Sequence, residues 1–146
     1  MLKNLIAALG LKPHQQTEVG QVINIYDAVI AHKAWKKRLF DYLEGNSRED
    51  LKVSKICVDN LCALGKWIHG DGKMRFGEQP VFIKLMEEHA KFHIHAAKVV
   101  EAYQSGNEEL ALGILTGIFE EQSRKTVTCL TKLNVLVEAQ NRDFEN

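Results

Sequence analysis

Apolar residues recur at helical spacing in the first half of the chain and predict two long helices there. The first runs from Thr17 to about Tyr42, and one stripe of it carries Val22, Ile25, Val29, His32, Leu39 and Leu43. Ser47, with an acidic residue three places on, predicts the start of a second helix that ends at Gly70. Its start could equally lie near Val53.

The second half of the chain predicts two more long helices, joined by a short polar turn. Pro80 suits the first turn of a third helix, which Gly106 ends. The inner stripe of this helix consists of Phe82, Leu85, Met86, His89, Phe92, His93, Ala96, Ala97 and Val100. Asn107 is a good first residue for a fourth helix that runs to about Val137. Short connections between long helices favour an antiparallel up-down four-helix bundle, so the predicted fold class is all-α.

The two ends of the chain differ in pattern from this bundle. Residues 1–16 carry apolar residues at helical spacing before Gly10 and Pro13, and predict a short extra N-terminal helix. This helix is expected to dock on its own bundle or on a twin subunit, with membrane contact as the less favoured alternative. The predicted organisation is an N-terminal amphipathic segment and linker at 1–16, a helical bundle at 17–140 and a polar tail at 141–146.

Composition and charge exclude several classes of partner. Lys+Arg and Asp+Glu both number 19, so the formal net charge is zero, and no basic stretch suggests nucleic-acid binding. No apolar run is long enough to form a transmembrane segment, and no convincing signal peptide is present. The 3 cysteines, an odd and small number, indicate a reducing compartment with thiols available for metal or redox chemistry. A cytoplasmic protein is therefore expected.

Three histidines and one cysteine on the inner stripes are predicted to meet at one level of the bundle. At about 1.5 Å per residue, His32 lies about 20 Å and Cys62 about 22 Å above the turn near Gly45. His89 and His93 lie about 14–20 Å above the same turn, one helical turn apart on one face. The spacing alone leaves two interpretations open, a metal centre or four hydrogen-bonded core residues.

This set of donor atoms, three nitrogens and one sulfur, favours zinc, which prefers a tetrahedron of borderline-soft ligands. Four protein ligands would close the coordination sphere and leave no place for a water, which argues against hydrolytic catalysis. A di-iron enzyme is the weaker alternative because no histidine has a carboxylate three places before it. Haem is disfavoured because C-x-x-C-H does not occur. One Zn²⁺ per chain and no enzymatic activity are expected.

The other histidines and cysteines are poorer ligands by the same arithmetic. His69 lies about 10 Å further along the predicted helix than Cys62, and Cys57 faces about 140° away from it. His95 follows His93 by two residues and so points elsewhere. Cys129 suits a buried apolar position.

Three short motifs resemble those of a known family, the chemoreceptor zinc-binding (CZB) domain. Its C-x-LGxW signature is matched by Cys62-Ala63-Leu64-Gly65-Lys66-Trp67, its first-helix H-x-x-W element by His32-Lys33-Ala34-Trp35, and its paired histidines by His89-Ala90-Lys91-Phe92-His93. The resemblance covers about residues 20–135 and implies that His32, Cys62, His89 and His93 bind zinc. The supporting residues implied are Trp35, Gly65 and Trp67. The two tryptophans are expected to exclude water from the site.

The family is regulatory, and its members are usually attached to bacterial chemoreceptors or diguanylate cyclases. Zinc occupancy, and in some members oxidation of the zinc-bound cysteine by hypochlorous acid, alters the attached output. The resemblance therefore implies a bacterial, chemotaxis-related sensor that forms a homodimer and signals to an unidentified partner protein.

This chain has no room for a cyclase or a methyl-accepting domain, so a stand-alone copy or a piece of a longer protein is expected. Cys62 is the expected redox-sensitive ligand, because zinc holds it as a thiolate. The alternative is a zinc ion that only staples a dimerisation or interaction protein.

Overall fold

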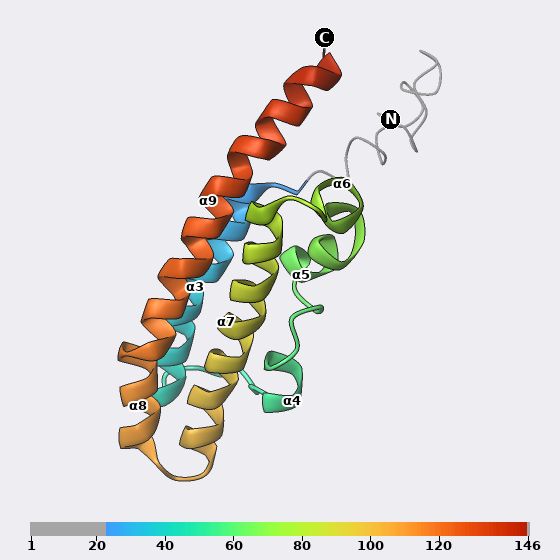
Figure 1. Ribbon diagram of the computed structural model, residues 1–146. Helices are drawn as coiled ribbons and strands as arrows, with labels where there is room; N and C mark the ends of the chain where they lie inside the picture. Colours follow the sequence, from blue (N-terminus) through green and yellow to red (C-terminus); the bar gives the residue numbers. More distant parts are fainter. Residues whose placement is uncertain (1–22, 146) are drawn as a thin grey trace, which may run out of the picture.

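The computed structural model describes residues 23–145, and these residues form helices and connecting loops without a strand. The long helices are α3 (Ile25–Leu43), α7 (Pro80–Gln104) and α9 (Ile118–Glu145), which pack lengthwise against one another (Figure 1). The predicted all-α class is confirmed. None of the described helices is both long and apolar enough to cross a bilayer. The predicted N-terminal helix at 1–16 lies outside the described residues.

The predicted fourth helix is divided into two. Helix α8 (Glu108–Thr116) ends at Gly117, whose φ of -109° and ψ of -100° are not helical, and α9 begins at the next residue. Asn107 caps α8 as predicted, because its side chain accepts a hydrogen bond from the backbone N–H of Leu110 at 3.0 Å. Helix α9 continues to Glu145, past the predicted end near Val137, so residues after 138 are helical.

The prediction of one long second helix from Ser47 to Gly70 is wrong. Residues 44–79, here called the connecting arm, contain four short helical pieces: α4 (Val53–Ile56), α5 (Ala63–Trp67), the π-helical η1 (Ile68–Gly72) and α6 (Lys73–Phe76). Ser47 does not start a helix, since its hydroxyl accepts a hydrogen bond from the N–H of Glu49 in a local turn. The arm runs opposite in direction to α3 and α7 and occupies the place of the predicted helix (Figure 1).

The break between α4 and α5 follows from the residues at 57–62. Asp59 and Asn60 are turn formers, since their side chains compete with the backbone for hydrogen bonds. Gly65 then allows the turn to fold back closely: a Cβ at this position would lie 1.7 Å from the carbonyl oxygen of Asp59. The loop and α5 therefore pack backbone against backbone, in an arrangement that a continuous helix cannot adopt.

Two apolar clusters form the core. The upper core joins α3, the arm, α7 and α9 and consists of Ile25, Ala28, Leu64, Trp67, Ile68, Phe76, Phe82, Leu85, Cys129, Leu130, Leu133 and Val137. The lower core joins α3, α4, α7, α8 and α9 and consists of Leu39, Leu51, Ile56, Phe92, Ala96, Ala97, Val99, Val100, Ala102, Ala111, Leu115 and Phe119. His32 and His89 are also buried, and along α3 and α7 they lie between the upper-core and the lower-core residues; the buried His93 follows one turn after His89.

Replacing Gly65 with alanine should destabilise the protein, because the new methyl group would overlap the Asp59 carbonyl. We expect a loss of about 1–3 kcal/mol, the usual cost of overpacking, in the free energy of unfolding measured with urea. The control is Gly113→Ala in the middle of α8, where nothing lies within 4 Å of the added Cβ. Its higher helix propensity should add up to about 1 kcal/mol. Equal effects of the two substitutions would contradict the close approach of the loop.

Candidate metal centre

The structure brings His32, Cys62, His89 and His93 together, and one donor atom from each lies within 4.8 Å of all the others. His32 comes from α3, Cys62 from the start of α5, and the other two histidines from successive turns of α7. These are the four residues proposed from the sequence as ligands, and their role as ligands stays a prediction. The four donor side chains come from three separate parts of the fold and meet at one point.

Backbone carbonyl groups fix the orientation of two of the imidazoles. The Nδ1 of His32 lies 2.7 Å from the carbonyl oxygen of Ala28, and the Nδ1 of His93 lies 3.0 Å from that of Ile56. Because a carbonyl only accepts, each Nδ1 carries the proton and donates it. The Nε2 of each ring is then left with a free lone pair, which is the form that binds a metal.

The distances between donor atoms fit a small cation. Nε2 of His89 lies 3.1 Å from Nε2 of His93 and 3.3 Å from Sγ of Cys62, and the His93 Nε2 lies 3.6 Å from the same sulfur. A tetrahedral zinc ion with ordinary bond lengths separates its nitrogen and sulfur ligands by roughly 3.3–3.6 Å. The Nε2 of His32 is buried and has no hydrogen-bond partner, as expected for a donor reserved for a metal.

Burial keeps the three imidazoles neutral. It lowers the pKa of His89 to about 2, and lowers the pKa of His32 and of His93 from their ordinary values. Burial also raises the pKa of the Cys62 thiol, despite backbone hydrogen bonds that act the other way. The thiolate at Cys62 therefore needs a positive charge beside it, and a divalent cation supplies one.

Cys62 reaches the centre by a different route from the one the sequence suggested. It is the N-cap of α5, with an extended ψ of 162°, and its sulfur accepts a hydrogen bond from the N–H of Gly65 at 3.3 Å. Cys62 therefore lies near the level predicted from the helix rise, although the chain reaches it through a broken helix. A backbone N–H directed at sulfur stabilises the thiolate form once it exists.

The same break in the arm supplies the partner of His93. In a continuous helix the carbonyl of Ile56 would accept from the N–H four residues later. Because α4 ends at Ile56, this carbonyl is free to accept the Nδ1 proton of His93 instead. Sequence reasoning missed Ile56 and Ala28, because a backbone carbonyl leaves no residue-type signal.

The predicted supporting residues lie in different places around the centre. Trp67 is buried in the upper core, where its ring packs against Phe76 and Phe82 and leaves no room for a side chain at position 72. Trp35 is half-buried beside the lower core, with the Arg38 guanidinium 3.8 Å above its ring. Gly65 holds the Cys62 loop in place. That the tryptophans exclude water from the metal remains a prediction.

Aromatic contacts that were not predicted as supporting residues line the site directly. The ring of Phe92 lies edge-on to both His32 and His93, with centroids 5.1 Å and 5.6 Å away. Phe92 is fully buried and so provides an apolar wall beneath the imidazoles. Sequence analysis placed it on the inner stripe of α7 but gave it no role at the site.

The other candidate ligands stand apart from this group. Cys57 is exposed, and its thiol donates to the carbonyl of Ser54. Cys129 is buried in the upper core. His69 is exposed and pairs with Asp59, while His95 is only partly buried on α7. None of these four side chains belongs to the donor group, as the sequence analysis expected.

A helical bundle that closes four such donors around one point is a zinc-binding module. Residues 32–100 match the family model of the chemoreceptor zinc-binding domain. The matched segment includes all four ligands. Neither the curated proteins nor the solved structures contain a match to this chain.

Zinc binding should release about one proton per ion near neutral pH, because the histidines are already neutral and only the Cys62 thiol must ionise. Apparent affinity should accordingly rise about tenfold per pH unit below the raised thiol pKa. Calorimetric titration in buffers of different ionisation enthalpy measures this number. Release of two or more protons would mean that charged histidines occupy the metal-free site, contrary to their burial.

Proposed function

We propose that this domain senses zinc and thiol oxidation and passes a change in conformation to a partner protein. The observation that carries the proposal is the contrast among the four ligands. The three histidines are buried on long helices, whereas Cys62 is partly exposed and lies beside a loop of the connecting arm. The least constrained and most accessible ligand is therefore also the one that can be oxidised.

In such a sensor the histidines and the cysteine have different roles. His32, His89 and His93 hold neutral Nε2 donors in a fixed array, and Cys62 adds the only sulfur of the set. Zinc, when bound, supplies the positive charge that keeps Cys62 ionised. Attack of the thiolate sulfur on the oxygen of hypochlorous acid forms a sulfenic acid and expels chloride: sulfur loses two electrons and chlorine gains them.

Loss of the Cys62 ligand would loosen the connecting arm in particular. α4 and α5 hold the arm at the centre through two links, the Ile56 carbonyl to His93 and Cys62 to the metal. Helices α3, α7 and α9 pack together independently of that sulfur. We infer that the arm is the moving part and that its displacement is the signal.

A zinc ion that only staples the fold is the alternative function. The burial of the histidines between the two cores supports it, since a metal at such a junction stabilises whatever it joins. An enzymatic role has less support, because the buried carboxylate nearest in sequence, Glu88, receives hydrogen bonds from Gln122 and Lys84 and lies outside the donor group. We propose a binding module without catalytic activity.

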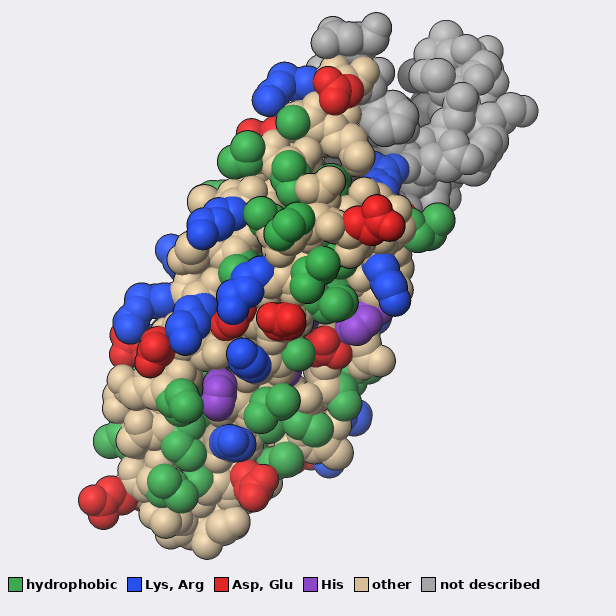
Figure 2. All heavy atoms as spheres, in the orientation of Figure 1, with side chains coloured by type: hydrophobic (Ala, Val, Ile, Leu, Met, Phe, Trp, Pro, Cys, Tyr) green, Lys and Arg blue, Asp and Glu red, His purple; other side chains and the backbone are tan. Residues whose placement is uncertain are grey.

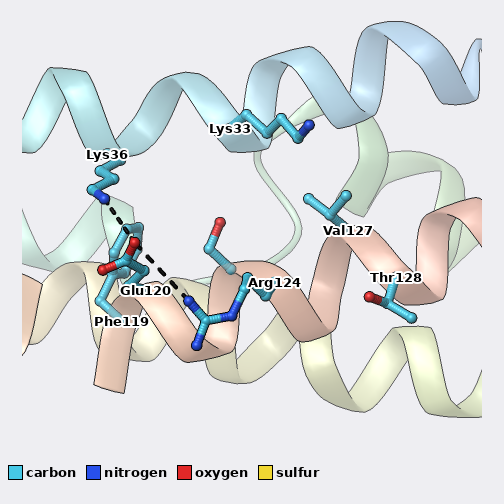
Figure 3. Close-up of a pocket in the computed structure, with 8 residues that line it drawn as sticks. Lys33, Lys36, Phe119, Glu120, Arg124, Val127 and Thr128 are labelled. Carbon is cyan, nitrogen blue, oxygen red and sulfur yellow. Dashed lines mark hydrogen bonds and ion pairs between the residues drawn. The ribbon is translucent and has the colours of Figure 1, made fainter. Parts of the chain in front are cut away.

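We also propose that the domain forms a homodimer in the bacterial cytoplasm through the outer face of α3 and α9. A cleft of about 370 Å³ lies between these helices. The ion pair of Lys36 and Glu120 links its two sides (Figure 3). Large apolar side chains stand exposed on the same two helices, with Tyr26 73% and Val135 64% exposed. A second copy would cover them. The signalling partner is a separate, unidentified protein.

Oxidation should release zinc through Cys62. Treating the zinc-loaded protein with stoichiometric hypochlorous acid should free the metal to a coloured chelator while one oxygen is added at Cys62 by mass spectrometry. Cys57→Ser is the matched control, because Cys57 is more exposed but belongs to no donor group, and it should release zinc like the wild type. If zinc is retained while Cys62 is oxidised, or if Cys62 stays unmodified, the result would favour a zinc ion with a purely structural role.

If the dimer forms through the outer face of α3 and α9, a charge introduced on that face should weaken it. Ile30→Glu places a carboxylate among the exposed apolar residues of α3 and should shift the sedimentation equilibrium toward the monomer. Met74→Glu on α6, at a position 84% exposed on the arm, is the control and should leave the dimer intact. A wild-type chain that stays monomeric at all concentrations, with or without chelator, would contradict the proposed interface.

A further inference from the structure

Cys62 is the most exposed of the four donor residues. His32, His89 and His93 are 3%, 0% and 4% exposed, whereas Cys62 is only partly buried. The loop before Cys62 therefore forms the outer rim of the site. Because the other three donors are buried, this rim is the side of the centre nearest to water by residue exposure.

Two side chains with zinc-binding chemistry stand on this rim. The Nε2 of His69, in η1, lies 3.2 Å from a carboxylate oxygen of Asp59, three residues before Cys62. Their side chains are 44% and 23% exposed, so both reach water. The Asp59 carboxylate also acts electrostatically on Cys62 and His93, and His69 acts on His89. The pair thus reaches water and lies close enough to the inner donors to act on them electrostatically.

The chemistry of the pair differs from that of the other exposed ion pairs. Imidazole nitrogen and carboxylate oxygen are both common zinc ligands, and here they are held side by side. The lysine or arginine pairs, such as Lys37 with Asp41, offer only one ligand and a repelling cation. An exposed pair of this kind contributes little to stability, so its two groups can part to admit a cation at small cost.

We propose that Asp59 and His69 form an exchange port, a weak outer site that takes up Zn²⁺ and passes it to Cys62 and the three histidines. The proposal deepens the proposed function, because a sensor must exchange its ion, and it depends on the inner site binding zinc. Each step of the passage makes one bond to the ion as another is broken. No redox change is required. Release follows the same path in reverse, through the same two side chains.

Such a port has a kinetic signature, since a transient site on the path changes both rates without changing the equilibrium. The variants are Asp59→Asn and His69→Gln, and Asp41→Asn is the control that removes a more exposed ion pair elsewhere on the surface. Each rim variant should slow zinc uptake and zinc loss to a competing chelator by about tenfold, the lower end of what outer-shell residues contribute at metal sites. The zinc affinity at equilibrium should stay within a factor of about two.

The other outcomes would overturn the port. Faster zinc loss with unchanged uptake would make the pair a latch that only holds the Cys62 loop. Slower zinc uptake in Asp59→Asn alone would mean that the pair only attracts the cation by charge. His69→Gln removes a ligand but leaves the negative charge in place, so a ligand role requires that it slows uptake too. Unchanged rates of zinc uptake and loss in both variants would mean that the pair is only a contact on the surface. A wild-type chain that binds no zinc at equilibrium would instead refute the metal centre itself, so the two failures are distinguishable.

Discussion

The hydrogen bond from His93 Nδ1 to the carbonyl of Ile56 connects the arm to α7, and the geometry of the centre depends on it. It fixes the tautomer of His93, so that Nε2 faces the other donors with a free lone pair. It exists only because α4 ends at Ile56 and leaves that carbonyl without a helical partner. The break also brings Cys62 into an extended N-cap conformation beside α7.

Polar contacts at the same level connect α7 to α9. Glu88, the residue before His89, is buried, and both its carboxylate and its carbonyl accept hydrogen bonds from Gln122 of α9. Thr126 donates to the same carbonyl. A buried carboxylate requires such partners, since an unpaired charge there would be costly. The residue next to His89 is thus tied to α9 by hydrogen bonds.

The sequence predicted the helical class and the ends of α7, and it proposed the four residues that the fold brings together. Helical periodicity and donor atoms both depend on residue type, so a sequence reveals them. It did not predict the broken second helix. Residues 47–70 contain good helix formers, and the break combines the turn formers Asp59 and Asn60 with a close backbone contact, the approach of the Asp59 carbonyl to Gly65. Gly65 was identified only as part of a motif, and its steric reason became visible once the loop was placed.

The supporting residues show the same limit. The two tryptophans were expected to exclude water from the site because they recur beside ligands in the sequence; the packing of Trp67 with Phe76 and Phe82 in the upper core was not predicted. The groups that touch the imidazoles are Phe92 and two backbone carbonyls. Contacts of the backbone and of ordinary apolar residues carry no distinctive sequence signal, so only the fold reveals them.

X-ray absorption at the zinc edge of the purified, zinc-loaded protein tests the central claim most directly. The account predicts one zinc ion per chain with three nitrogen neighbours at about 2.0–2.1 Å and one sulfur neighbour at about 2.3 Å. Cys62→Ala should remove the sulfur contribution and leave the nitrogen contribution. A wild-type spectrum without sulfur, or a protein that retains no zinc, would contradict the centre described above.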